Sequence, residues 1–126
     1  MTSDPAKTDS HPWPNELKLK KSERRLIVSF DSGEKFSLPA ELLRVESPSA
    51  EVQGHGSGQK TTVAGKRNVT IEALEPVGNY AVRIIFGDGH DSGLFTWETL
   101  HRLGADQEQI FADYIAALTD KGLSRD

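Results

Sequence analysis

Cysteine is absent from the 126 residues of this sequence, and methionine occurs once. The chain alone therefore holds no disulfide, no thiol nucleophile, and no cysteine-bound zinc or iron–sulfur cluster. Long hydrophobic runs are absent too, because no apolar stretch approaches the roughly 20 residues that cross a membrane. The remaining composition, 36% hydrophobic and 27% charged, is typical of a soluble globular protein, so we expect no membrane partner.

A net positive charge is also lacking. The formal charge is -4 and the sequence pI is about 5.5, which argues against a nucleic-acid partner because such domains are usually basic. Positive charge is concentrated only near the start of the fold, and we interpret it as solvated strand faces and a turn. The residues concerned are Lys18, Lys20, Lys21, Arg24 and Arg25. The N-terminal residues have no hydrophobic signal-peptide core, so the expected compartment is the cytoplasm.

The length suits one domain, because a chain of this size can enclose a single hydrophobic core. Residues 1–12 are polar, include Pro5 and Pro12 and show no periodicity, so we expect a disordered tail there. We place a single domain at residues 13–122 and a short C-terminal tail at residues 123–126.

Alternating hydrophobic residues predict strands in the first half of the domain. The alternation occurs at residues 17–19, 26–30 and 36–38. Turn-forming residues 31–34 separate the last two segments, which favours a β-hairpin or a meander.

The middle of the sequence is expected to be mostly irregular. Pro39 fits the first turn of a short helix that continues to Leu43, and residues 44–49 then form a loop. Residues 53–66 include four glycines and little periodic hydrophobicity, so they predict a flexible internal loop.

A strand pattern returns at Val69 and Ile71. The strongest alternation of the chain follows, and we expect its even-numbered face to lie in the core; that face carries Tyr80, Val82, Ile84 and Phe86. Residues 87–93 then form a turn before the next apolar residues, which places His90 at the tip of a hairpin.

Two helices are expected near the C-terminus. Thr96 is placed to cap a helix over residues 97–103, and Gly104 to end that helix in a left-handed conformation. Asp106 and Gln109 resemble a capping box for the second helix, whose apolar stripe is Ile110, Phe111, Tyr114, Ile115 and Leu118. The elements together predict an α+β fold: a mainly antiparallel β-module, as a sandwich or curled sheet, with a short middle helix and two C-terminal helices.

His90 stands between Asp88 and Asp91, two acidic neighbours that can raise its proton affinity or orient it as a metal ligand. The same residues are also ordinary turn formers. His55, between two glycines, is a second imidazole that can join such a site. Ser92, His90 and Asp88 form a hydrolytic triad on paper only, since the sequence has no Gly-x-Ser-x-Gly elbow. No catalytic constellation is identified.

Several motifs occur in an order that resembles one protein family. They are Trp13-Pro14, Leu42-Leu43-Arg44, Ser47-Pro48-Ser49-Ala50-Glu51-Val52, Glu75-Pro76-Val77-Gly78-Asn79-Tyr80 and Asp88-Gly89-His90-Asp91-Ser92-Gly93, followed by Trp97 and Leu100. They resemble the DUF971 family, also called the gamma-butyrobetaine hydroxylase-like N-terminal domain, across about residues 13–104. The resemblance implies a small β-rich module, which in carnitine-pathway dioxygenases precedes a separate catalytic domain.

The resemblance also implies a zinc site, made of a Cys-Pro-Cys-x-x-Cys motif and a later histidine. With the motifs aligned on Leu43-Arg44, the cysteine positions hold Ser47, Ser49 and Val52 in this sequence, and the histidine position holds His90. One imidazole does not hold zinc as four ligands do, so we expect no zinc. We also expect no iron-binding catalytic domain like that of those dioxygenases, because the accessory domain already takes up these 126 residues. The family domain is also found attached to P-loop ATPases that resemble iron–sulfur scaffolds, which suggests a portable interaction module.

Two hypotheses follow. The first is a non-enzymatic accessory module without a cofactor, which binds an unidentified protein partner through Arg44, His55, Asn79, Tyr80, His90 and Trp97. The alternative is an iron- or zinc-binding protein linked to iron–sulfur or oxygenase systems, with ligands from His90, His55, Asp88 and Asp91. The oligomeric state stays open.

Overall fold

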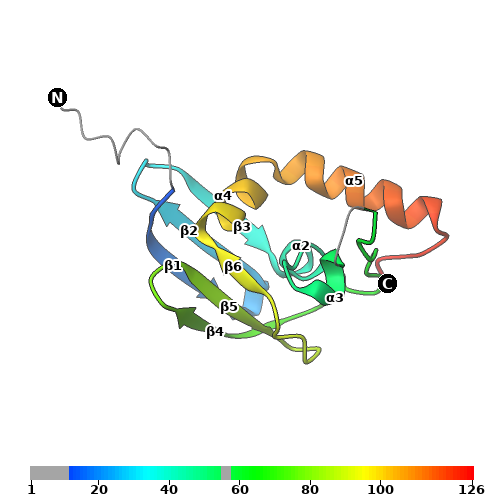
Figure 1. The fold of residues 1–126 in the computed structure, drawn as a ribbon, viewed down its shortest axis with the longest axis horizontal. Helices are drawn as coiled ribbons and strands as arrows, with labels where there is room; N and C mark the ends of the chain where they lie inside the picture. The colour runs from blue at the N-terminus through cyan, green and yellow to red at the C-terminus, as the bar shows by residue number, and fades with distance from the viewer. Residues whose placement is uncertain (1–11, 55–57) are drawn as a thin grey trace.

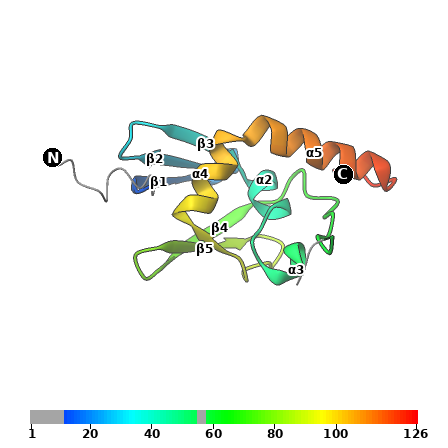
Figure 2. The same cartoon turned by 45° about the horizontal axis from the view of Figure 1, so that its top comes forward.

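The fold is that of a computed structural model, which describes residues 12–54 and 58–126. Within these residues, two antiparallel sheets of three strands each enclose a shared hydrophobic core. Figure 1 shows the order of the elements, and Figure 2 shows the two sheets as separate layers. The expected α+β class with antiparallel strands is confirmed.

The first sheet is a meander of β1 (Pro14–Lys20), β2 (Arg25–Phe30) and β3 (Lys35–Pro39), in that order. A short 3-10 turn, η1 (Lys21–Glu23), connects the first two strands. Leu26, Val28 and Phe30 are buried while the residues between them are half-buried, because successive side chains of a strand point to opposite faces. The expected strands of this half are therefore confirmed.

The second sheet consists of β4 (Ile71–Val77), β5 (Ala81–Phe86) and β6 (Leu94–Thr96), again in chain order. Val82, Ile84 and Phe86 are buried, as expected. Tyr80 does not join them. It lies in the turn before β5, whose first residue already pairs with Val77, so its side chain is 53% exposed.

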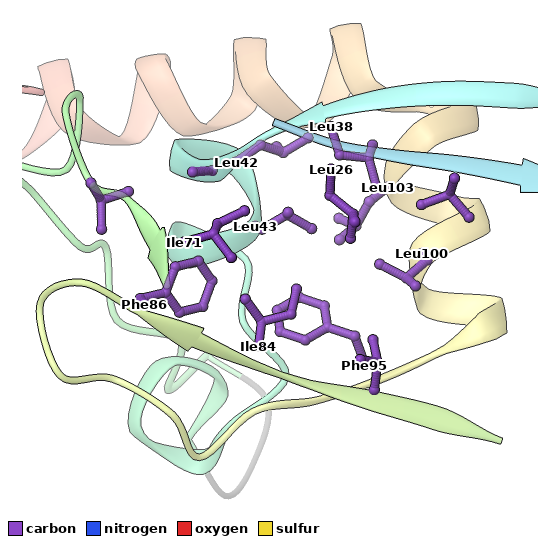
Figure 3. Packing of buried hydrophobic residues seen from close by; sticks show 14 of the residues in the cluster. Leu26, Leu38, Leu42, Leu43, Ile71, Ile84, Phe86, Phe95, Leu100 and Leu103 are labelled. Carbon is purple, nitrogen blue, oxygen red and sulfur yellow. The ribbon is translucent and has the colours of Figure 1, made fainter. Parts of the chain in front are cut away.

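Two short helices follow the first sheet: α2 (Ala40–Val45) and α3 (Ala50–Gln53). Pro39 precedes α2 in an extended conformation, and the helix continues past the expected end at Leu43. The loop between the helices is therefore shorter than the expected 44–49 segment. Leu42 and Leu43 of α2 are fully buried in the core, where Figure 3 shows them among side chains of both sheets.

Helix α4 (Trp97–Ala105) packs against β3 and β6, so it bridges the two sheets. The Thr96 hydroxyl accepts the backbone N–H of Thr99 at 3.1 Å, which confirms the expected cap. The expected role of Gly104 is wrong, because this residue lies inside the helix. A Cβ at Gly104 would lie 2.3 Å from the Phe36 ring, so glycine allows the close approach of α4 to β3.

Helix α5 (Gln107–Asp120) begins without the expected capping box. Asp106 makes no side-chain cap bond, and Gln109 donates to Asp113 at 2.8 Å instead. The reason is that Asp106 also ends α4, where its N–H bonds to the Arg102 carbonyl. It therefore cannot adopt the extended conformation of a usual N-cap. The expected apolar stripe does bury Tyr114 and Leu118 against Val45, with the remaining members half-buried.

The last residues, expected as a tail, bond to the rest of the domain. The backbone N–H groups of Gly65 and Arg67 donate to the carbonyls of Ser124 and Arg125 at 2.9 and 3.0 Å. The Arg125 guanidinium also forms two hydrogen bonds with the buried Glu41 carboxylate, at 2.6 and 2.8 Å. Among the residues described, no helix combines the length and hydrophobicity needed to cross a membrane.

Candidate functional site

The loop between β5 and β6, residues 87–93, folds back so that His90 is buried. The Phe86 N–H donates to the His90 carbonyl at 3.0 Å, and the His90 N–H donates to Asp88 Oδ1 at 3.0 Å. The imidazole lies near the Phe86 ring, with 5.9 Å between the ring centroids, and His90 is only 7% exposed. The hairpin is as expected, but His90 points into the protein rather than marking an exposed tip.

Two serine hydroxyls from the loop between α2 and α3 converge on one nitrogen of this ring. Ser47 Oγ lies 2.9 Å from His90 Nε2, and Ser49 Oγ lies 3.3 Å from the same atom. On the other side of the ring, Glu51 Oε1 lies 3.5 Å from Nδ1. The Ser49 backbone N–H also donates to Ser47 Oγ at 3.3 Å. We call Ser47, Ser49, Glu51 and His90 the imidazole cluster.

The ring of His90 is held in its neutral form. Burial lowers the pKa of His90, and the positive Arg44 acts in the same direction, while Glu51, Asp88 and Asp91 oppose them. The acidic neighbours thus raise the proton affinity of His90, as expected, but desolvation is the larger effect and the net shift of the pKa is downward. A neutral imidazole has one donor and one acceptor. The assignment that suits both sides has Nδ1–H facing the Glu51 carboxylate and Nε2 accepting from the serines.

Asp88 anchors the start of the loop between β5 and β6. Its Oδ2 accepts from Arg44 Nε at 2.8 Å and from Lys66 Nζ at 2.6 Å. Burial raises the pKa of Asp88, but the bonds from Lys66, the His90 amide and Arg44 outweigh it and hold the pKa well below its usual range. This carboxylate is therefore ionised and joins the loop to α2 and to the segment before β4.

The structure does not assemble Ser92, His90 and Asp88 into a hydrolytic triad. The Ser92 hydroxyl donates to Glu51 at 2.6 Å rather than to the imidazole. Ser47, His90 and Glu51 do line up in a triad-like order, but Ser47 is 0% exposed. Since a nucleophile must reach its substrate, this arrangement is better suited to holding the loop in place.

Asn79, Tyr80 and Trp97 of the expected partner surface lie at the other end of β5, in the turn between β4 and β5 and at the start of α4; Figure 1 shows this turn at the opposite end of β5 from the β5–β6 loop. The Trp97 indole N–H donates to the Asn79 carbonyl at 2.9 Å, and Tyr80 projects from the same turn. Strand β5 has six residues, so roughly 20 Å of strand separates this turn from the His90 loop. The expected single surface is thus two separate regions, and His55 lies outside the described residues.

Comparison with known proteins agrees with this architecture. A family model named gamma-butyrobetaine hydroxylase-like, N-terminal, matches residues 17–101. The chain belongs to this family. No curated protein matches it.

Solved structures support the membership in the gamma-butyrobetaine hydroxylase-like N-terminal family. Two NMR solution structures are each 46% identical to this chain, with TM-scores of 0.79 and 0.80. They cover 91% and 99% of this chain, and the match covers 90% of each of them. A crystal structure of an Acidithiobacillus ferrooxidans protein of unknown function, from the DUF971 family, is 39% identical with a TM-score of 0.60. That match covers 71% of this chain and 90% of the other.

The zinc site implied by the family resemblance does not fit the residues present. The structure brings three of the four aligned positions together, because Ser47, Ser49 and His90 are in direct contact. Serine hydroxyls are not among the usual zinc ligands, and Val52 carries no donor atom. In the described part of the chain, no three His, Cys, Asp or Glu side chains are arranged to hold a metal ion.

The alternative metal site is not assembled from its described members. Asp88 contacts His90 through the backbone N–H rather than the ring, and its other oxygen is occupied by Arg44 and Lys66. Asp91 is exposed. Because His55 is outside the described residues, this hypothesis stays a prediction.

Sequence reasoning missed two residues that complete the site. Glu51 lies within the family motif of residues 47–52 with no separate role expected, yet it faces the imidazole. Lys66 was assigned to a flexible loop, yet it binds Asp88. No local signal identifies either one, because their partners lie 39 and 22 positions away in the sequence.

Proposed function

We propose that this chain is a non-catalytic binding module that docks a protein partner at the turn between β4 and β5. The observation that supports this most directly is Tyr80, an aromatic side chain that is 53% exposed on a well-anchored turn. Tyrosine is enriched among the residues that carry most of the binding energy at protein interfaces. Its ring supplies apolar area while its hydroxyl can bond to the partner.

The turn holds Tyr80 in a defined place. Gly78 has a positive φ of 54°, and a Cβ there would lie 3.1 Å from the Tyr80 ring. The neighbouring Asn79 carbonyl is bonded to the indole of Trp97, which itself packs against the core. A side chain that is already ordered loses less entropy when it binds. The turn is therefore suited to presenting Tyr80 to a partner.

The opposite end of β5 is less suited to docking. The ring nitrogens of His90 and the carboxylate of Asp88 already have partners within the domain. Polar groups that are bonded internally must give up those bonds before they bind a partner. We therefore assign Arg44 and His90 to holding the loop and not to the docking surface.

Site-specific crosslinking tests this proposal. A photoreactive amino acid is placed at position 80, and in a matched control at Trp13, an aromatic residue that is 49% exposed in the segment leading into the other sheet. We expect a defined protein adduct from position 80 and none from position 13. Capture of the same partner by the unlabelled protein should be lost in Tyr80→Ala and kept in Trp13→Ala. Equal adducts from both positions, or normal capture by Tyr80→Ala, would contradict the proposal.

A further inference from the structure

We infer that the imidazole cluster is a metal-free substitute for the thiolate zinc site that the family resemblance implies, and that cysteines in place of Ser47, Ser49 and Val52 are enough to make this chain bind zinc. The hydrogen bonds of Ser47 and Ser49 to His90 then do what a metal ion would do, since they join the β5–β6 loop to the segment between α2 and α3. This inference concerns the His90 end of the domain and does not depend on the docking surface at Tyr80.

The orientation of the imidazole is the first argument. Nε2 faces Ser47 and Ser49, whereas Nδ1 faces the carboxylate of Glu51. Metal-binding histidines usually have this arrangement, in which one nitrogen is a ligand and the other donates to a carboxylate. The cluster thus has the carboxylate that usually accompanies a metal-binding histidine, but serine hydroxyls face the nitrogen that would bind the metal.

The spacing of the donor atoms is the second argument. Ligand atoms about 2.0–2.3 Å from a tetrahedral zinc ion lie roughly 3.3–3.7 Å from one another. The two hydroxyl oxygens lie 2.9 and 3.3 Å from Nε2, which is direct hydrogen-bond distance. An outward shift of a few tenths of an ångström would suffice for an ion, and the larger radius of sulfur favours a shift in that direction.

The chemistry of the side chains at these positions decides whether hydrogen bonds or a zinc ion hold the segments together. A serine hydroxyl stays neutral near pH 7 and forms good hydrogen bonds with a neutral imidazole. A cysteine thiol loses its proton readily beside a metal ion, and the thiolate is a strong zinc ligand. The family resemblance implies a third sulfur position at Val52, a buried residue of α3 whose backbone N–H donates to the Ser49 carbonyl at 3.1 Å.

Four proteins test the inference: the wild type, Ser47→Cys/Ser49→Cys, the same pair with Val52→Cys, and that triple variant with His90→Ala. Each is purified without an affinity tag under reducing conditions, incubated with zinc, passed through a desalting column and analysed for metal. The wild type should hold no stoichiometric zinc and should keep its unfolding midpoint in EDTA. The triple variant should bind about one zinc per chain. The added His90→Ala change should weaken that binding by at least about tenfold.

Cobalt provides a second measurement. When cobalt replaces zinc, the triple variant should show the visible absorption of tetrahedral thiolate coordination, and the wild type should not. A folded triple variant that binds no zinc would overturn the inference, as would a wild type that loses stability when EDTA removes a stoichiometric metal. If the triple variant folds only with zinc, the inference is supported. If neither the double nor the triple variant folds with zinc present, donor exchange is not sufficient and the inference fails.

Discussion

The two ends of strand β5 carry opposite kinds of surface. At the end that leads to His90, polar side chains are turned inward and bonded to one another. At the end that begins after Tyr80, an aromatic ring is exposed, and none of the described residues bonds its hydroxyl. The difference shows that conspicuous polar motifs in this chain serve to hold a loop, whereas the less conspicuous aromatic turn is available for contact.

The two ends should therefore respond differently to substitution. A buried polar group that loses its partner leaves an unsatisfied donor or acceptor, which costs about 1–3 kcal/mol. An exposed side chain away from such features usually changes stability by no more than about 0.5 kcal/mol. Changes at the His90 end should thus lower stability, whereas changes at the Tyr80 end should lower binding with little effect on stability.

The largest effect is expected from His90→Ala. Removal of the imidazole leaves a void beside Phe86 and takes the shared partner from Ser47 and Ser49. We expect a loss of roughly 2–4 kcal/mol in the free energy of unfolding, measured by urea denaturation. A loss below about 0.5 kcal/mol would remove the distinction between the two ends.

A somewhat smaller effect is expected from Gly93→Ala. A Cβ at Gly93 would lie 2.2 Å from Ser47 Oγ, while its next neighbours are 3.3 Å or more away. Overpacking of this kind costs about 1–3 kcal/mol. Because Ser47→Ala removes the clashing oxygen, the double variant should lose less stability than the sum of the two single variants. Simple additivity would show that Gly93 and Ser47 do not compete for the same space.

The strands were predictable because their signal is local. Alternation of apolar residues within a few positions located β2 and β5, and Thr96 revealed the start of α4 because a cap acts over three residues. Tyr80 was assigned to the core because the alternation continues through it, although strand pairing begins one residue later. The pattern cannot show where pairing begins, since that depends on the opposite strand.

The errors at other positions have a non-local cause. Gly104 has the sequence context of a helix end, but it meets Phe36 from a strand far away in the sequence. The same holds for the candidate site. The family motif identified Ser47, Ser49 and His90 as corresponding positions, and the fold does bring them together. Which groups satisfy the imidazole and whether it is charged depend on burial, which the sequence does not give.

The stability of the folded domain should depend on pH through His90. Burial lowers the pKa of His90, so the folded value lies below the roughly 6.5 of an unfolded chain. As the pH falls, the unfolded state binds this proton first, and the folded state loses stability down to its own pKa. Urea denaturation between about pH 7 and 5 should show a decrease in the wild type and a smaller one in His90→Gln. Identical slopes would mean that His90 does not titrate as a buried group.

Asp88 should produce a separate decrease at lower pH. Its folded pKa is held well below the usual range by Lys66, the His90 amide and Arg44, although burial alone raises it. Stability from this carboxylate is present above about pH 4 and is lost as the pH falls further, because the unfolded chain is protonated first. Asp88→Asn should reduce this acid-dependent loss. Because the Asp88 charge raises the pKa of His90, the same change should enlarge the decrease assigned to His90.

The smallest effect on stability is expected from Tyr80→Ala. The ring is more than half exposed, and Tyr80 is not among the described residues that form the hydrophobic core or pack against it. Urea denaturation should show a change within about 0.5 kcal/mol, and NMR amide shifts should change only around the β4–β5 turn. A larger loss would show that the aromatic ring supports the turn itself. In that case reduced partner capture by Tyr80→Ala would no longer identify a docking contact, and Tyr80→Phe, which keeps the ring, would be needed to separate support from recognition.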